Sequence, residues 1–131
     1  MERTAVNPVT WSLDMGFNQG EVVSGHTRTL YCSGQTAMSE DGRPEHEGDM
    51  AAQLALSLDN LEGVLDAAGM SLANLVRLNV YTTDVDLLFP HYDALASRLR
   101  AAGVAPATTM LGVARLAVPG QMVELEGTAV A

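Results

Sequence analysis

The sequence predicts an α+β fold in which two helices cover one face of a β-sheet. Segments that alternate apolar and polar residues are typical of strands, and leucines spaced three and four residues apart are typical of a helix. The two halves of the chain also share a motif. Ala-Ala-Gly occurs at 67–69 and again at 101–103, and each time it ends a helical segment before a loop and a strand. We therefore expect two strand–helix units on one sheet, in the order strand, strand, helix, strand, helix, strand, strand.

The first part of the chain is predicted to contain an irregular start, a hairpin and a loop. Residues 1–20 are expected to be irregular, with a turn at Asn7-Pro8. Residues 21–35 hold two short strand-like runs on either side of Ser24-Gly25, which predicts a β-hairpin. The Asp-Gly and Pro residues within 39–44 then indicate a loop.

The first helix is expected to begin at Gly48 or Asp49 and to end at Ala68. The Asp49 side chain suits the N-cap, because its carboxylate can accept hydrogen bonds from free backbone N–H groups of the first turn. Gly69 suits the left-handed position just beyond the end of the helix. Four leucines lie on one face of this helix: Leu54, Leu58, Leu61 and Leu65.

A second helix is expected to begin between Asp86 and Pro90 and to end at Gly103. Pro90 is tolerated only in the first turn of a helix, where the N–H that proline lacks would have no partner within the helix. Three further segments alternate and are therefore predicted to be strands: 75–83, 108–116 and 122–130.

The alternation also predicts which side chains of these strands face the helices: Val76, Leu78 and Val80; Thr109, Leu111 and Val113; Val123, Leu125 and Ala129. The opposite face is expected to carry a mixture of charged, aromatic and apolar residues: Arg77, Tyr81, Met110, Glu124 and Glu126. This mixture suits neither a private core nor open water. We therefore expect another copy of the chain to cover the face, with a site between the copies.

The composition limits the classes of function. The 131 residues are enough for one domain, 1–131, that folds without a disulfide or a metal. The net charge is −9 and the seven basic residues are scattered arginines, which argues against a nucleic-acid partner and excludes chemistry on a lysine. A single cysteine excludes an internal disulfide and favours the reducing cytoplasm. No apolar run approaches the roughly 20 residues that span a bilayer, so no membrane partner is expected.

A series of short motifs extends over nearly the whole chain: Phe17-Asn18-Gln19-Gly20, Cys32-Ser33-Gly34-Gln35, Gln53 with Leu58-Asp59-Asn60-Leu61, Ala67-Ala68-Gly69-Met70-Ser71, Val80-Tyr81-Thr82-Thr83-Asp84, Pro106-Ala107, Val113-Ala114-Arg115-Leu116 and Val123-Glu124-Leu125-Glu126. In order and spacing they resemble the YjgF/RidA family of small proteins. The resemblance implies a chorismate-mutase-like α+β subunit with a mixed sheet. It also implies a homotrimer, with three ligand-binding clefts between neighbouring subunits.

The same resemblance implies a chemistry and a set of site residues. Typical members hydrolyse reactive imines and enamines and release ammonia, without a metal or an organic cofactor. In the family, the glutamate that corresponds to Glu124 holds or activates the attacking water. The other expected site residues, all ligand-binding, are Phe17, Ser33, Gly34, Tyr92, Thr108 and Met110. The family also carries an older label as a ribonuclease, which the net charge of −9 argues against here.

Several of these positions depart from the family pattern. Deaminating members carry an arginine after the Pro-Ala pair, and it grips the substrate carboxylate, whereas this chain has Thr108. A threonine hydroxyl offers one uncharged hydrogen bond in place of a charged, bidentate pair. Phe17 stands where many members have a tyrosine, Tyr92 lies near a common asparagine, and Met110 replaces a common cysteine. The ligand is therefore expected to differ from a simple 2-imino acid.

Other polar residues are given plainer roles. Arg115 is predicted to be structural, on the helix side of the sheet, and Glu126 is also predicted to be structural. Arg77 has the better direction for a substitute anion anchor, with a role in subunit packing as its alternative. Cys32 is expected to be a small buried residue rather than a nucleophile. The three histidines lack metal-ligand spacing: His26, His46 and His91.

Two classes of function therefore remain open at the level of the sequence. The first is an imine or enamine hydrolase with an altered substrate preference, in which Glu124 holds or activates the attacking water. The second is a binding or regulatory trimer without turnover. Ammonia release from a panel of imines, compared with Glu124→Ala, separates the two.

Overall fold

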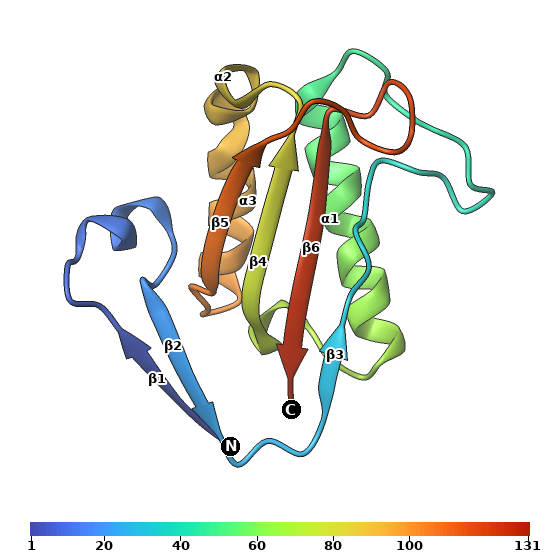
Figure 1. The fold of residues 1–131 in the computed structure, drawn as a ribbon. Helices are drawn as coiled ribbons and strands as arrows, with labels where there is room; N and C mark the ends of the chain where they lie inside the picture. Colours follow the sequence, from blue (N-terminus) through green and yellow to red (C-terminus); the bar gives the residue numbers. More distant parts are fainter.

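The computed structural model describes residues 1–131, and its main feature is a four-stranded mixed sheet with helices against one side (Figure 1). The strands lie in the order β3-β6-β4-β5, with β4 and β5 parallel and the other neighbours antiparallel. Their bounds are Thr29–Tyr31 for β3, Leu75–Thr82 for β4, Ala107–Gly112 for β5 and Val123–Val130 for β6. Helices α1 (Met50–Ala67) and α3 (Tyr92–Ala101) lie on the same side of this sheet, which confirms the predicted α+β fold.

Helix α1 (Met50–Ala67) begins one residue after Asp49, the later of the two predicted starts, and ends one residue before the predicted Ala68. The Asp49 carboxylate accepts a hydrogen bond from the backbone N–H of Ala52 at 3.0 Å, as expected for an N-cap. Gly69 has a φ of +71°, a left-handed conformation that an L side chain rarely adopts. The four leucines spaced along the helix are all buried against the sheet: Leu54, Leu58, Leu61 and Leu65.

The second helical segment consists of three pieces rather than one helix: α2 (Val85–Leu88), the 3₁₀ turn η3 (Phe89–His91) and α3 (Tyr92–Ala101). Asp84 caps α2 by accepting from the backbone N–H of Leu87 at 3.0 Å. Pro90 then interrupts the helix, because it has no N–H to donate to the carbonyl four residues earlier. Gly103, with a φ of +73°, ends α3 as predicted.

The N-terminal region differs from its prediction. Strand β1 (Glu2–Val6) pairs antiparallel with β2 (Gly20–Ser24), and the short 3₁₀ helix η1 (Trp11–Met15) lies between them. The predicted hairpin over 21–35 is therefore wrong, since β2 turns away and β3 pairs instead with β6. Proximity in sequence suggested the pairing, but β3 places Leu30 against the core only when it lies beside β6. Figure 1 shows the β1–β2 hairpin standing apart from the main sheet, on its β5 side.

The pairing of β5 with β4 inverts the predicted faces of β5. Thr108 is aligned with Leu78 and Met110 with Val80, and these two partners are fully buried on the helix side. Met110 therefore faces the core rather than the open face of the sheet. Leu111, which was expected to face the helices, lies on the open face and is 50% exposed. Strand β5 also ends at Gly112, four residues earlier than predicted.

Strand β4 contains a register shift between Leu75 and Arg77. Because of this irregularity, Leu75 is buried along with Leu78 and Val80, whereas Val76 is only half-buried and leaves the predicted alternation. The rest of β4 and all of β6 keep the faces that the sequence predicts, with Val123 and Leu125 on the helix side.

No helix of the chain is both long enough and apolar enough to cross a bilayer.

Candidate functional site

The predicted site residues fall into two groups on opposite sides of the sheet. Phe17, Tyr92, Thr108 and Met110 lie together on the helix side, next to the edge strand β5. The Glu124 side chain lies against Gly34 on the open face, on the far side of β4. Strand adjacency therefore does not join Thr108 to Glu124 within one chain, because β4 separates β5 from β6 and the two side chains point to opposite faces. The groups can share one cleft only if they come from two copies.

The first group lines a recess of about 190 Å³, which we call the aromatic recess. It is built by η1, by the η3–α3 junction and by β5, and six of its seven lining residues are hydrophobic. The seven are Trp11, Met15, Phe17, Phe89, Tyr92, Thr108 and Met110. Trp11, Met15 and Phe89 were missed by the sequence analysis. The clue to Trp11 and Met15 was the presence of large apolar side chains in a segment expected to be irregular, and Phe89 lies at the start of the predicted second helix.

Local backbone geometry explains why the aromatic side chains meet. Gly16 ends η1 with a φ of +85°, which turns the chain so that Phe17 comes back toward Trp11. The two rings lie edge to face, with centroids 6.0 Å apart and an interplanar angle of 84°. On the other wall, the rings of Phe89 and Tyr92 are 6.4 Å apart and tilted by 56°. The recess is thus lined by two pairs of aromatic rings, and the two rings of each pair pack against each other.

No charged side chain lines this recess. The Thr108 hydroxyl donates a hydrogen bond to the carbonyl oxygen of Pro106 at 2.8 Å, so its proton is not free for a ligand. Burial raises the pKa of Tyr92, so its phenol is neutral at physiological pH. The recess therefore offers apolar contact and no cation for a carboxylate.

The second group, which we call the acidic half-site, consists of Ser33, Gly34 and Glu124. A Cβ atom at Gly34 would lie 1.8 Å from Oε1 of Glu124, so the carboxylate rests directly on the glycine backbone. Reciprocal backbone hydrogen bonds between Gln35 and Leu125, of 2.7 and 2.9 Å, hold the two segments together. Ser33 is exposed, and Glu124 accepts no hydrogen bond within the chain. The half-site therefore presents an unpaired carboxylate on the open face.

The neighbouring carboxylate on this face is already engaged. Asn79 Nδ2 and the Tyr81 hydroxyl both donate to Oε1 of Glu126, at 2.9 and 3.1 Å. The hydrogen bond to Glu126 raises the pKa of Tyr81, and partial burial and the negative charges nearby add to the rise. Arg77 donates to the hydroxyl of Thr109 at 2.8 Å. Of the two glutamates, only Glu124 is free to act on a ligand.

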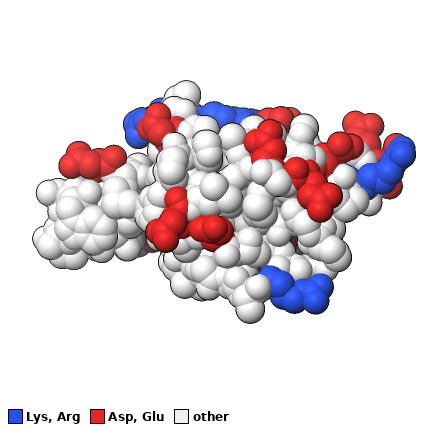
Figure 2. Space-filling model, turned by 90° about the horizontal axis from the view of Figure 1, so that it is seen from above, with Lys and Arg blue, Asp and Glu red and all other residues white.

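The other candidates of the sequence analysis have structural environments. Cys32 is buried, and burial raises the pKa of its thiol, which keeps it protonated. Arg115 is exposed in the irregular segment that follows the end of β5, so the prediction that it lies on the helix side by alternation is wrong. The acidic balance of the surface is visible in Figure 2, where Asp and Glu side chains spread over one face and Arg side chains lie at its margins.

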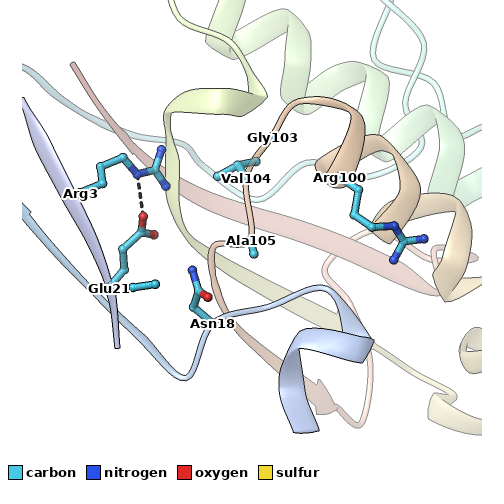
Figure 3. A pocket seen from close by; sticks show the side chains of 8 residues that line it. Arg3, Asn18, Glu21, Arg100, Gly103, Val104 and Ala105 are labelled. Atoms are coloured by element: carbon cyan, nitrogen blue, oxygen red, sulfur yellow. Dashed lines mark hydrogen bonds and ion pairs between the residues drawn. The ribbon is translucent and has the colours of Figure 1, made fainter. Parts of the chain in front are cut away.

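The largest hollow, of about 630 Å³, lies elsewhere, between the β1–β2 hairpin and the segment that leads into β5 (Figure 3). Its charged groups are used within the chain. Arg3 Nε donates to Oε1 of Glu21 at 2.6 Å, and the same guanidinium donates to the carbonyl oxygens of Ala73 and Leu75. Arg100 is paired with Asp93 at 2.9 Å. We assign this hollow a structural role, because Arg3 fastens the hairpin to the start of β4.

Comparisons with known proteins place this geometry in a wider context. The family model described as endoribonuclease L-PSP matches residues 14–131. The crystal structure of YyfB from Yersinia pestis, a protein of the Rid family, is 31% identical and covers 100% of both chains with a TM-score of 0.88. Protein mmf2 of Schizosaccharomyces pombe, named as mitochondrial, is 29% identical over 96% of each chain. TdcF of Escherichia coli, solved with bound serine, is 26% identical with a TM-score of 0.69, covering 88% of this chain and 87% of its own.

Proposed function

The chain belongs to the endoribonuclease L-PSP family, which includes the YjgF and Rid proteins, and from that premise we propose that it binds a small metabolite in clefts between the subunits of a homotrimer. The observation that carries this proposal is the division of the site. The aromatic recess has an apolar wall but no acid or base, and the acidic half-site has a free carboxylate but no wall. A recess of one copy set against a half-site of the next supplies both.

The open face of the sheet supports the assembly. Tyr31 is 79% exposed and Leu111 is 50% exposed on this face, beside polar groups that already satisfy one another. Large apolar side chains exposed beside polar groups that bond to one another favour contact with a second copy. We expect a homotrimer of about 41 kDa, three times 13.8 kDa. The unit that assembles is proposed to be one domain, residues 1–131.

The proposed chemistry is the hydrolysis of an imine or of the enamine that tautomerises to it. Glu124 accepts a proton from a water molecule as that water attacks the imine carbon, which forms the new C–O bond. Protonation of the nitrogen then allows the C–N bond to break, and the products are a carbonyl compound and ammonia. The water supplies the oxygen and two hydrogens, so no oxidant, metal or organic cofactor enters the balance.

The substrate is proposed to differ from a 2-imino acid. The Thr108 hydroxyl donates to a backbone carbonyl, and no cationic side chain lines the aromatic recess. Arg77, the candidate replacement anchor, is on the open face and donates to Thr109. We therefore expect weak or absent activity on 2-iminobutyrate and 2-aminoacrylate. The serine bound to TdcF supports a small-molecule ligand for a protein of this fold, and the ligand of this chain is expected to lack the carboxylate.

The experiment that tests the catalytic role measures ammonia release from imines generated in situ by an amine oxidase or an amino-acid oxidase. Glu124→Gln removes the base while keeping the shape, and it should lower the rate roughly 100- to 10,000-fold. Gly34→Ala should also lower the rate, because the new Cβ must displace the carboxylate of Glu124. Glu40→Gln, in an exposed loop, removes the same charge and should leave the rate unchanged.

A binding or regulatory trimer is the second candidate function, and the absence of a charged anchor in the aromatic recess favours it. It predicts that the wild-type protein releases no ammonia above the spontaneous rate while a ligand still binds in the cleft. A rate that is unchanged in Glu124→Gln would likewise remove Glu124 from the mechanism.

The cytoplasm is the proposed location, on the grounds of a single reduced cysteine. Because mmf2 carries a mitochondrial name, a cell fractionation experiment is the relevant test. Enrichment in an organelle would contradict the proposal.

A further inference from the structure

We propose that the aromatic recess receives the side chain of the ligand, and that this side chain is an uncharged aromatic ring. The inference rests on the proposed function and names its substrate class: imines or enamines of arylalkyl compounds that lack a carboxylate. In hydrolysis, an arylalkyl imine and water give the corresponding arylalkyl carbonyl compound and ammonia. The ring binds in the recess of one copy, and the reacting carbon lies at the mouth, toward Glu124 of the next copy.

The first argument is the apolar surface that the recess leaves exposed. Trp11 is 59% exposed and Phe89 is 47% exposed, and both line the same recess, so two large aromatic side chains lie partly in water at one place. Exposed apolar area costs roughly 25 cal/mol per Å², so a ligand that covers these rings gains affinity from the contact alone. An aromatic ring covers them without requiring any polar partner.

The second argument is size. An apolar cavity of about 150 Å³ is large enough to hold benzene, and the aromatic recess measures about 190 Å³. It therefore accommodates one six-membered ring with a short alkyl link. Its aromatic walls can also contact a further ring, since Trp11 and Phe17 already pack edge to face.

The third argument is charge. A carboxylate in the recess would lose water and find no cation, because none of the seven lining residues is charged and the Thr108 proton is already donated to Pro106. A small organic cation could bind over the ring faces. The recess holds no carboxylate that would pair with such a cation, whereas a neutral ring binds by apolar contact alone and can pack edge to face as Trp11 and Phe17 do.

The chain carries its own reporter for this site. Trp11 is the only tryptophan, and it lines the recess, so its fluorescence reports what occupies the recess without an added label. The wild-type protein should be titrated with 2-phenylethanol, with phenylacetate and with tetramethylammonium. We expect a saturable change in Trp11 emission with 2-phenylethanol, binding at least about tenfold weaker with phenylacetate, and no change with tetramethylammonium.

Matched variants show whether the signal comes from the recess. Phe89→Ala removes one wall and should weaken the binding of 2-phenylethanol about tenfold or more. Leu87→Ala is the control, because Leu87 is 42% exposed in the same helical segment and does not line the recess. Its affinity should equal that of the wild type. Equal affinities for all three proteins would overturn the assignment of the ring to this recess.

Other results also overturn the proposal. Tighter binding of tetramethylammonium than of 2-phenylethanol would make the recess a cation site. Trp11 emission that is already blue-shifted and responds to no probe would show that a neighbouring chain fills the recess.

The binding titration needs no turnover, so its failure and that of the proposed function can be told apart. Ring binding is measured in the wild type and in Phe89→Ala, and ammonia release is measured in the wild type and in Glu124→Gln, so each proposal has its own readout. If ring binding holds but ammonia release fails, the catalytic proposal falls and the ligand class stands. If ammonia is released from aliphatic 2-imino acids while Trp11 responds to no ring, the ligand class falls and the hydrolase stands.

Discussion

The two faces of the four-stranded sheet are built by the same strands, yet they are completed in different ways. On the helix side, Leu78, Val80 and Leu125 have no exposed surface, because α1 and α3 cover them. On the open side, Tyr31 and Leu111 are largely exposed, and polar side chains bond to one another across the strands. The difference shows that the chain covers the helix face by itself and leaves apolar side chains of the open face in water, where we propose that a second copy packs. The candidate site is divided in the same way, because the aromatic recess lies on the helix side of the sheet and the acidic half-site lies on the open face.

The largest expected effect concerns the open face. A charge buried without a partner is costly, so Leu111→Glu should prevent assembly and give a species of 13.8 kDa by light scattering at micromolar concentration. Leu87→Glu is the control, because Leu87 has a similar exposure but lies on α2, outside the sheet face. A wild-type monomer would contradict the trimer, and an assembled Leu111→Glu would show that this face is not the interface.

The helix face should respond through the stability of the subunit itself. Leu78→Ala removes a fully buried side chain and should lower the free energy of unfolding by about 2–5 kcal/mol. Leu111→Ala, on the opposite side of the sheet, should have a smaller effect that depends on protein concentration, because only assembly buries it. Urea unfolding at several protein concentrations separates the two. A concentration-independent loss of equal size in both variants would remove the distinction between the faces.

The ligand preference of the aromatic recess can be tested by introducing a positive charge at position 108. Thr108→Arg should create affinity for a carboxylate such as 2-oxobutyrate, on the order of a hundredfold above the wild type, because a guanidinium offers two parallel donors. The same change should weaken the binding of a neutral ring. Thr108→Lys is the comparison, and it should gain less, since an ammonium cannot make the paired bonds. Calorimetry measures both. No binding by Thr108→Arg in an intact trimer would show that more than the arginine is missing and would favour the non-catalytic function.

The smallest expected effect is a pH dependence on the open face. The Tyr81 pKa is raised above 10.0, first by its hydrogen bond to Glu126, so folding favours the protonated phenol. That contribution is fully present below the unfolded pKa of about 10 and is lost as the pH rises through the raised value. The free energy of unfolding of Tyr81→Phe should therefore fall less steeply than that of the wild type between about pH 9 and 11. Parallel slopes in denaturant titrations of the two proteins would contradict this.

Neighbouring residues alone predict the helix α1 and the alternation of β6 correctly. The leucine spacing, the Asp49 cap and the position of Gly69 define α1, because helix hydrogen bonds join residues four apart. The alternation of β6 also held, with Glu124 on the open face and Leu125 on the helix side. The prediction of the two faces of β5 was wrong because apolar residues occur on both of them. Only the pairing of β5 with β4 decides that Met110 points inward.

The sequence by itself determined the α+β class, the two helices on one face, the family and the choice of Glu124 as a candidate site residue, whereas the structure decided that Glu126 is engaged and Glu124 is not. The tertiary structure decided which strands pair and which side chains meet. It separated Glu124 from Thr108, set Glu124 on Gly34, and gathered Trp11 and Phe89 around Phe17. The physical reason is range: helix caps and side-chain periodicity act over a few residues, whereas strand order and a pocket wall depend on contacts between segments far apart in the chain.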